Sequence, residues 1–377
     1  MLRRRTQALR ALSEKRKMEN KAILQSLKHV FETNNPEWEN IKIENLELQS
    51  FEKTNVLSDI YFFDLLINEN SQNKQLKLVL KLGLGTDKST ASVWASERQV
   101  MSKLHECGYS VPRILDFGEN LIADRGAFIV MERIEGRNLS EVIDESMNNN
   151  QALNGYLDRY AELMVELHNF RCNGEMINIG RKNEMFTSGH NNPVAAYLDD
   201  YLKFSNQIQY DSLSNIIDWL LIESKKLEVP LELGMTHGDF QTDNVMVQES
   251  GNFCTIDWGF ARTADIRLDI HWSNLLNRFR HNELISERIY TLYLKHQERE
   301  LTDNPFFEVL SMARLLIGLA QLAYRSKNYH ESVDKFIYTM DMGYMKRKLS
   351  EATELTLPDL ESDFRQVTGV ESVTLNA

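Results

Sequence analysis

One segment of eight residues, His237 to Asn244, carries the residue types best suited to chemistry in this chain. It reads His-Gly-Asp-Phe-Gln-Thr-Asp-Asn, and a short apolar run further along ends at Asp257. The pair Ser250-Gly251 between two apolar runs predicts a hairpin with a two-residue loop. In that register Asn244 lies opposite Asp257, with the Asp239 carboxylate on the loop just before them. The sequence therefore predicts that an amide oxygen and two carboxylates gather at one place.

Such a group of oxygen atoms suits Mg²⁺, which prefers oxygen ligands and usually shares its coordination with phosphates. We expect Asn244 and Asp257 to hold the metal, which would offset charge on a transferring phosphoryl group. Asp239 is then left to orient an incoming hydroxyl group and accept its proton. Taken singly, these residues have ordinary roles in turns and at strand ends, so only the combination indicates chemistry.

The order of strand-like and helical patterns predicts an α+β fold. Before about residue 135, five runs rich in branched and aromatic residues predict strands: Ile41–Phe51, Ile60–Ile67, Leu76–Leu82, Arg113–Phe117 and Ala127–Ile134. One main helix, capped by Ser89 or Thr90, follows the third of these runs. Beyond Gly136 the apolar spacing is helical over Tyr156–Phe170, Pro193–Asn206, Leu213–Leu227, Ile270–Arg280, Leu284–Glu300, Pro305–Arg325 and Tyr329–Leu349, with strands only at 245–247 and 253–256. A small five-stranded lobe is thus expected to precede a larger, mostly helical lobe.

The charge and composition exclude several classes of function. The chain has 377 residues, with 43 Lys and Arg against 55 Asp and Glu, a net charge of −12. Residues 1–30 carry nine basic and two acidic side chains, a net +7, which leaves −19 on the rest of the chain. This acidic excess is unfavourable for binding a nucleic-acid backbone and suits a cationic ligand better. No apolar run approaches the roughly 20 residues of a membrane-spanning helix.

The three cysteines indicate the cellular compartment. Cys107, Cys172 and Cys254 lie far apart and lack the paired spacing of a zinc site or a redox motif. This pattern favours reduced thiols and predicts a cytoplasmic location.

The segment from His237 to Asn244, together with Ile256-Asp257-Trp258, resembles the aminoglycoside phosphotransferase and choline kinase-like family of small-molecule kinases. In that family the loop reads His-Gly-Asp-x-x-x-x-Asn and is followed by a strand-borne Ile-Asp-Trp. Protein kinases have Arg where Gly238 stands, and Phe-Gly follows their metal-binding Asp. The resemblance covers about residues 40–345. It implies a two-lobed protein kinase-like fold, with ATP or GTP as co-substrate and Mg²⁺ as cofactor.

The resemblance also implies which residues of the first lobe bind the nucleotide. Lys81 matches the family's phosphate-binding lysine, and Glu97 on the following helix can hold it in place. The loop between the first two strands lacks the glycines common in phosphate loops. Asn55 and Ser58 are therefore expected to contribute polar side chains to the nucleotide.

A second set of residues is matched to the hinge and to the support of the catalytic loop. Backbone groups of Glu132 and Ile134 are expected to pair with the adenine edge, with Met131 behind the ring. Asp269 matches a family residue that hydrogen-bonds the catalytic loop from behind. His237 is expected to be a packed histidine rather than a proton carrier.

These assignments divide the chain into four segments. Residues 1–40 predict a basic extension and a docking helix whose apolar face consists of Ile23, Leu24, Leu27, Val30 and Phe31. Residues 41–134 form the nucleotide-binding N-lobe, and residues 135–350 form the helical C-lobe with the catalytic loop and substrate pocket. Residues 351–377 have no clear period and predict a weakly ordered C-terminal tail.

The leading hypothesis is an enzyme that transfers the γ-phosphoryl group of ATP or GTP to a hydroxyl of a small molecule. A protein Ser/Thr kinase and a catalytically silent kinase-fold scaffold are the alternatives. The acceptor is expected to be cationic or polyhydroxylated, because of the charge excess and of four acidic residues that could frame the pocket: Asp265, Glu308, Glu331 and Asp341. Several aromatic residues could instead line a more apolar cavity: Trp258, Phe260, Trp272, Tyr324 and Tyr344.

Overall fold

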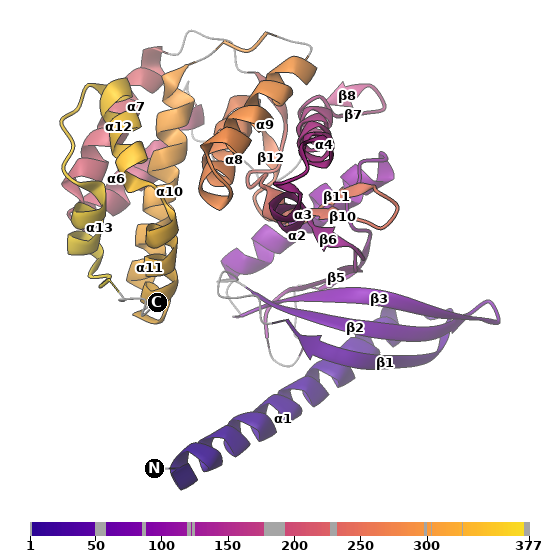
Figure 1. Ribbon diagram of the computed structural model, residues 1–377. Helices are drawn as coiled ribbons and strands as arrows, with labels where there is room; N and C mark the ends of the chain where they lie inside the picture. The colour runs from indigo at the N-terminus through magenta and orange to yellow at the C-terminus, as the bar shows by residue number, and fades with distance from the viewer. Residues whose placement is uncertain are drawn as a thin grey trace. The chain divides into compact units, whose positions relative to one another are not determined.

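The computed structural model describes residues 2–49, 58–84, 88–118, 122, 125–176, 193–226, 232–297, 300–302, 304–325 and 327–372. The chain divides into two compact units. Unit 1 comprises Met1–Glu135 and Cys254–Gly259, and unit 2 comprises Gly136–Phe253 and Phe260–Ala377. Unit 1 contains a five-stranded sheet and unit 2 is mostly helical, so the chain has the predicted α+β fold (Figure 1).

The sheet of unit 1 is antiparallel and has the strand order β1-β2-β3-β5-β4. Its strands are β1 (Trp38–Leu48), β2 (Ser58–Glu69), β3 (Gln72–Gly83), β4 (Ile114–Gly118) and β5 (Phe128–Glu132), each overlapping a predicted strand. In β3, Leu78, Leu80 and Leu82 are buried on one face of the sheet. Because side chains alternate along a strand, Lys81 projects from the other face.

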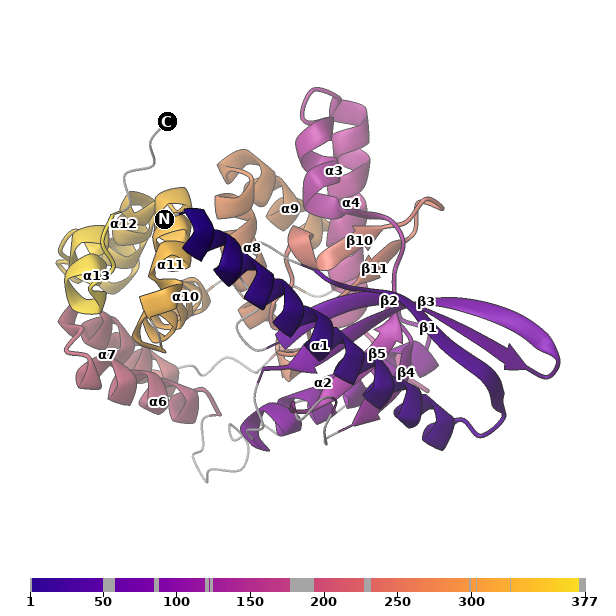
Figure 2. The same cartoon turned by 90° about the horizontal axis from the view of Figure 1, so that it is seen from below.

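Two helices accompany this sheet, α1 (Leu2–Asn34) and α2 (Lys88–Glu106). The helix α1 runs without a break from Leu2 and crosses one face of the sheet (Figure 2). Its docked face consists of Ile23, Leu27 and Phe31, which follow the four-residue spacing of one helix face and are fully buried in the sheet's core cluster. The predicted docking helix is therefore present.

Unit 2 is built from ten α-helices within the part of the chain that the structure describes. They are α3 (Leu139–Ser146), α4 (Asn150–His168), α6 (Pro193–Gln207), α7 (Asp211–Lys226), α8 (Ile266–Arg280), α9 (Glu283–His296), α10 (Pro305–Arg325), α11 (His330–Thr339), α12 (Met342–Thr353) and α13 (Leu360–Thr368). Two short 3₁₀ helices are η1 (Thr242–Asn244) and η2 (Lys327–Tyr329). Its short strands are β6 (Arg137–Asn138), β7 (Arg171–Cys172), β8 (Glu175–Met176), β9 (Leu233–Thr236), β10 (Val245–Val247) and β12 (Arg262–Asp265), and β11 (Phe253–Thr255) begins in it.

The strand pair β9 and β12 is the main element that the sequence pattern misses. It is antiparallel, with Thr236 paired to Arg262 and Leu233 paired to Asp265. Each strand has only four residues, which is too short for an alternating pattern to stand out. The pair matters because the candidate catalytic segment, His237–Asn244, starts directly after β9, and α8 starts directly after β12.

The single helix predicted over Tyr329–Leu349 is wrong, because the structure has two helices there, α11 and α12. The Asp341 side chain lies between them and accepts a hydrogen bond from the backbone N–H of Tyr344 at 2.7 Å. An aspartate in this position caps a new helix start. The apolar period continues across the break, which is why the pattern alone did not show it.

The hairpin after the catalytic segment also differs from the prediction. The backbone N–H of Gly251 donates to Gln248 O, and the N–H of Gln248 donates to Asn252 O, both at 2.9 Å. Gly251 has a φ of 83°, in the left-handed region. These features define a three-residue loop with a glycine bulge, so the expected two-residue loop and its register are wrong by one residue.

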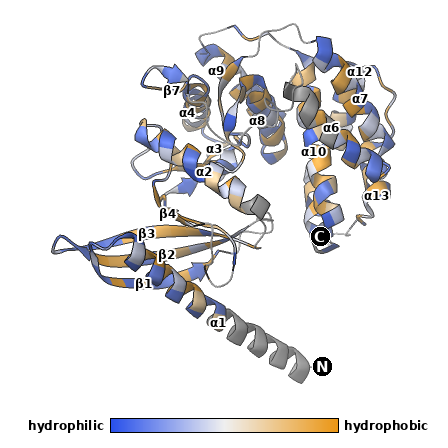
Figure 3. Ribbon diagram, turned by 180° about the vertical axis from the view of Figure 1, so that it is seen from behind, coloured by the Kyte–Doolittle hydropathy of each residue, from blue (hydrophilic) through white to orange (hydrophobic). Residues whose placement is uncertain are grey.

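The core of unit 2 surrounds α10, whose apolar residues are visible in Figure 3. Among the described helices, α10 alone is long and apolar enough to cross a membrane by length and composition, which the sequence analysis overlooked. Most of its residues are buried in the core of unit 2, as expected for a central helix of a globular unit.

The weakly ordered tail predicted over 351–377 is also wrong for most of its length. Residues 360–368 form α13, which the Asp359 side chain caps through the backbone N–H of Ser362. Leu360 and Phe364 are buried in the same core as α10, and the Arg365 guanidinium lies 2.7 Å from Asp334. The acidic and hydroxyl residues that suggested disorder include the cap and the polar face of this helix.

One of the three cysteines, Cys254, is a free, buried thiol. The cytoplasmic location stays a prediction.

Candidate active site

The catalytic segment of unit 2 is held from behind by Asp269 in the first turns of α8. Asp269 Oδ2 accepts from the backbone N–H of His237 at 2.8 Å, and Oδ1 accepts from the N–H of Gly238 at 2.9 Å. His168 Nε2 lies 3.2 Å from the same carboxylate. Burial alone would raise the pKa of Asp269, but the hydrogen bond from His168 and the nearby histidines outweigh it and lower the pKa. Asp269 thus has the supporting position that was predicted.

His168 and His237 are both fully buried, as packed histidines are. His168 bridges two elements, because its Nδ1 lies 2.7 Å from the Tyr293 hydroxyl of α9. His237 Nδ1 accepts from the backbone N–H of Asp239 at 3.3 Å. The two rings are therefore fixed parts of the scaffold behind the loop.

Gly238 occupies a position that only glycine fits. Its φ is 78°, and a Cβ atom there would lie 2.5 Å from the carbonyl oxygen of Phe260. Its own carbonyl oxygen accepts a hydrogen bond from Arg314 at 2.7 Å. The Arg314 guanidinium also stacks 4.0 Å from the ring centroid of Trp272.

The carboxylate of Asp239 is half-buried and oriented by three donors. Trp272 Nε1 donates to Oδ1 at 2.9 Å, while Gln241 Nε2 and Asn244 Nδ2 donate to Oδ2 at 3.1 Å and 2.9 Å. Asn244 Nδ2 also donates to the Asp239 carbonyl. With its amide nitrogen so engaged, Asn244 keeps its Oδ1 as an oxygen donor for a cation.

A buried polar network fixes the rest of the segment. The Tyr160 hydroxyl of α4 donates to the Phe240 carbonyl at 3.2 Å. Asn277 Oδ1 of α8 accepts from both the N–H and the hydroxyl of Thr242. The Thr242 hydroxyl also lies 2.9 Å from His281 Nε2, so α4 and α8 together determine the path of the loop.

Unit 1 contains a second cluster, centred on Lys81 of β3. Lys81 Nζ lies 2.8 and 3.0 Å from the two carboxylate oxygens of Glu97, which is only 2% exposed. The same Nζ lies 2.8 Å from Asp257 Oδ1 and 5.3 Å from the Trp94 ring centroid. Burial acts to lower the pKa of Lys81, but the two carboxylates reverse this and raise it. Lys81 is therefore a fixed positive charge.

Asp257 combines an exposed carboxylate with a strained backbone. Its side chain is 47% exposed, and its φ of 65° is uncommon for a residue other than glycine. The carboxylate of Asp257 in unit 1 and the amide oxygen of Asn244 in unit 2 are each hard oxygen donors, the kind of ligand that Mg²⁺ prefers.

The hinge residues lie at the end of β5. Met131 is buried and Glu132 is exposed. The backbone N–H of Glu132 donates to Arg113 O at 2.9 Å, so the expected adenine contact relies on its carbonyl and on the Ile134 backbone. Ser58 is buried at the first position of β2 opposite Gly83, and Asn55 lies outside the described residues.

Three residues around the loop were not assigned by the sequence analysis: Trp272, Asn277 and Arg314. Trp272 was considered only as a possible cavity lining. The helical spacing from Asp269 could have identified Trp272, because Asp269, Trp272 and Asn277 share the face of α8 that points to the loop. Arg314 had no such signal, since it lies 76 residues from its partner Gly238.

Two features together define a phosphotransferase with a protein kinase-like fold. One is a carboxylate on a loop of the helical unit, and the other is a buried lysine–glutamate pair in the unit with the five-stranded sheet. The model of the phosphotransferase enzyme family matches residues 67–300, which is more than half of the chain. The chain belongs to this family.

Solved structures agree with this fold. A Ralstonia eutropha JMP134 protein provisionally assigned as an aminoglycoside phosphotransferase has a TM-score of 0.57 at 16% identity, covering 92% of this chain and 98% of that one. An ethanolamine kinase from Plasmodium vivax has a TM-score of 0.50 at 13% identity, covering 89% of each chain. No curated protein matches the sequence.

Proposed function

We propose that this phosphotransferase transfers the γ-phosphoryl group of ATP or GTP to a hydroxyl group of a small molecule. The observation that carries the proposal is the geometry of Asp239, whose carboxylate is fixed by three donors on a loop whose backbone is pinned by Asp269. A carboxylate held in this way can accept the proton of an attacking hydroxyl group without reorienting.

The other residues have separate roles in this proposal. Lys81, oriented by Glu97, would contact the phosphates of the nucleotide. Asn244 and Asp257 would hold Mg²⁺, which when bound offsets the charge on the transferring group. The rest of the nucleotide would be contacted by Met131, by the backbone groups of Glu132 and Ile134, and by the side chains of Asn55 and Ser58.

The backbone at Gly238 argues against the protein kinase alternative. An arginine there, as in protein kinases, would need a left-handed backbone and would bring its Cβ against Phe260 O. The scaffold alternative is disfavoured because Asp239 is present and Lys81 is paired with Glu97.

We propose a cationic or polyhydroxylated acceptor, although the four acidic residues first considered do not support it. Asp265 is buried against Arg267 and caps α8, and Asp341 caps α12. Glu308 accepts from the Tyr344 hydroxyl, and Glu331 pairs with Lys335. The charge argument therefore rests on the net −19 of residues 31–377, which would steer a cationic acceptor.

The test is a phosphate-transfer screen that covers hydroxylated antibiotics, amino alcohols, sugars and nucleosides, with ATP and with GTP. We expect a phosphorylated small molecule, detected by mass, from the wild type and not from Asp239→Asn. Transfer to protein substrates alone would favour the protein kinase alternative. A nucleotide-dependent rise in melting temperature without any turnover would favour the scaffold.

The class of acceptor is tested by measuring kcat/KM for the identified substrate from low to high ionic strength. A cationic acceptor predicts a decline with salt, because screening removes electrostatic steering. A flat profile, or a neutral and apolar acceptor, would contradict the cationic assignment and leave phosphotransfer in place.

A further inference from the structure

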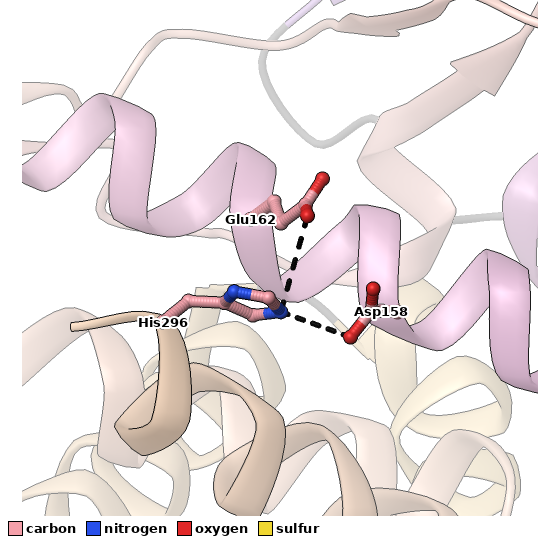
Figure 4. A group of neighbouring side chains, drawn as sticks. All are labelled: Asp158, Glu162 and His296. Atoms are coloured by element: carbon pink, nitrogen blue, oxygen red, sulfur yellow. Dashed lines mark hydrogen bonds and ion pairs between the residues drawn. The ribbon is translucent and has the colours of Figure 1, made fainter.

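A histidine and two carboxylates converge between α4 and α9, on side chains that the proposed reaction does not use. Asp158 and Glu162 lie one turn apart on α4, and both point to the ring of His296 at the end of α9 (Figure 4). One ligand atom from each of the three side chains lies within 4.8 Å of the others. All three side chains are half-buried, so an ion and water could reach them.

The separations suit a metal ion at the centre of the group. His296 Nε2 lies 2.9 Å from Asp158 Oδ1 and 4.0 Å from Glu162 Oε1. Tetrahedral zinc with ligands at about 2.0–2.2 Å places neighbouring ligand atoms roughly 3.3–3.6 Å apart. The two distances from His296 lie on either side of this range, and each differs from it by less than 1 Å. The remaining pair of ligand atoms, from Asp158 and Glu162, lies within 4.8 Å.

The neighbouring charges leave the required atoms available. Arg159 lies 3.3 Å from Glu162 Oε2 and is held more closely by Glu166 at 2.6 Å. The oxygen of Glu162 that faces His296 is the other one, Oε1. Arg159 can therefore orient Glu162 while Oε1 coordinates an ion, as second-layer hydrogen bonds do at known metal sites.

We propose that Asp158, Glu162 and His296 form a structural site for a divalent transition metal, with zinc favoured by the mixed nitrogen and oxygen donors. The ion would replace the proton between His296 Nε2 and Asp158 and would join α4 to α9. These two helices also meet at His168 and Tyr293, which support Asp269 behind the catalytic loop. A metal here would therefore stabilise the scaffold of the loop without taking part in the reaction.

The experiment measures zinc binding to the full chain after treatment with a chelator, by titration calorimetry and by the visible absorption of Co²⁺ as a substitute. We expect wild type to bind zinc at this site and to melt at a higher temperature when loaded. Affinity should fall at least roughly tenfold in His296→Ala and in Glu162→Gln, because even the loss of an outer-shell hydrogen-bond partner costs roughly 10- to 100-fold in metal affinity.

Two controls separate this site from other metal-binding groups. His29→Ala removes an exposed helical histidine of α1 and should leave zinc binding unchanged. Asp257→Asn alters the proposed Mg²⁺ site and should also leave it unchanged, so the result does not depend on the proposed function. Absence of zinc binding in wild type, or equal affinity in His296→Ala and Glu162→Gln, would overturn the proposal.

Discussion

Asp239 owes part of its orientation to side chains that lie far from it in sequence. Trp272 Nε1 donates to its carboxylate from α8, and Asp269 of the same helix pins the two backbone N–H groups before it. Gly238 permits the close approach of Phe260 O that the turn requires. The motif supplies the carboxylate, and the contacts from α8 help to orient it. Both are therefore needed for Asp239 to act as a proton acceptor.

Replacing Asp239 by asparagine tests the proton acceptor. The change keeps the shape and removes the base, so we expect kcat to fall by roughly 10² to 10⁴ while nucleotide affinity is retained. Asp243→Asn is the matched control in the same segment, because Asp243 pairs with Arg280 instead. Steady-state kinetics measure both. Normal turnover in Asp239→Asn would show that another group accepts the proton.

Replacing Lys81 by alanine tests the nucleotide-binding role. We expect ATP with Mg²⁺ to raise the melting temperature less in Lys81→Ala than in wild type. The free protein should also lose stability, by about 3–5 kcal/mol, because Glu97 is left buried without its partner. The double variant Lys81→Ala/Glu97→Gln should recover part of this loss and still bind ATP weakly. Equal protection by ATP in all variants would exclude Lys81 from the site.

At the scale of elements, α8 organises the catalytic segment, and the residue after it, His281, contacts the segment through Thr242. His281 Nε2 lies 2.9 Å from the Thr242 hydroxyl and Nδ1 lies 2.9 Å from Asp144. Burial lowers the pKa of His281, and the hydrogen bond to Asp144 only partly opposes it. Arg280 beside it lowers the pKa further.

This lowered pKa predicts how the stability of the protein depends on pH. Below about pH 6.5 the unfolded chain takes up a proton at His281 that the folded protein does not, so the free energy of unfolding falls with acidification. The variant His281→Gln keeps a polar side chain that does not titrate. Its free energy of unfolding should therefore fall less than that of wild type between about pH 7 and pH 5. Urea unfolding at several pH values measures this. If the free energy of unfolding depended on pH in the same way in both proteins, the lowered pKa of His281 would be contradicted.

The helix α13 is a structural element and not a tail. Leu357, Leu360, Phe364 and Val370 are all buried in unit 2. Deleting residues 356–377 should lower the free energy of unfolding by several kcal/mol, because each buried apolar side chain contributes about 1.5–3 kcal/mol. Deleting 373–377 alone is the control and should change the melting temperature little. A stable protein without 356–377 would show that α13 is dispensable.

At the scale of the whole molecule, the basic start of the chain should be separable from the fold. The docked face of α1 begins at Ile23, and Glu19 lies 3.0 Å from Arg125 of the same unit. Deleting residues 1–18 keeps all of these contacts, so activity and melting temperature should be retained. Deleting 1–34 removes Ile23, Leu27 and Phe31 and should destabilise the protein strongly. Loss of folding or activity in the shorter deletion would show that the basic segment is part of the working structure.

The sequence by itself determined the parts of this protein that depend on local patterns. Alternating and branched residues fixed the five strands of unit 1, and the spacing of His237, Asp239 and Asn244 indicated phosphotransfer chemistry. Lys81 and Glu97 could be paired through the resemblance to the family, because Lys81 matches its phosphate-binding lysine and Glu97 lies on the next helix. These predictions concern residues whose neighbours in space are also close in sequence or follow from one element.

Tertiary structure decided those features of the protein that depend on contacts between residues far apart in sequence. The ladder of β9 and β12 brings α8 behind the catalytic loop, which is why Trp272 touches a segment more than 30 residues away. Arg314 reaches the same loop from α10. The bulge at Gly251 and the cap at Asp341 changed local geometry without changing the apolar pattern. α13 became ordered because the surface of α10 and its neighbours buries it, and an apolar period of nine residues cannot reveal a partner that other helices supply.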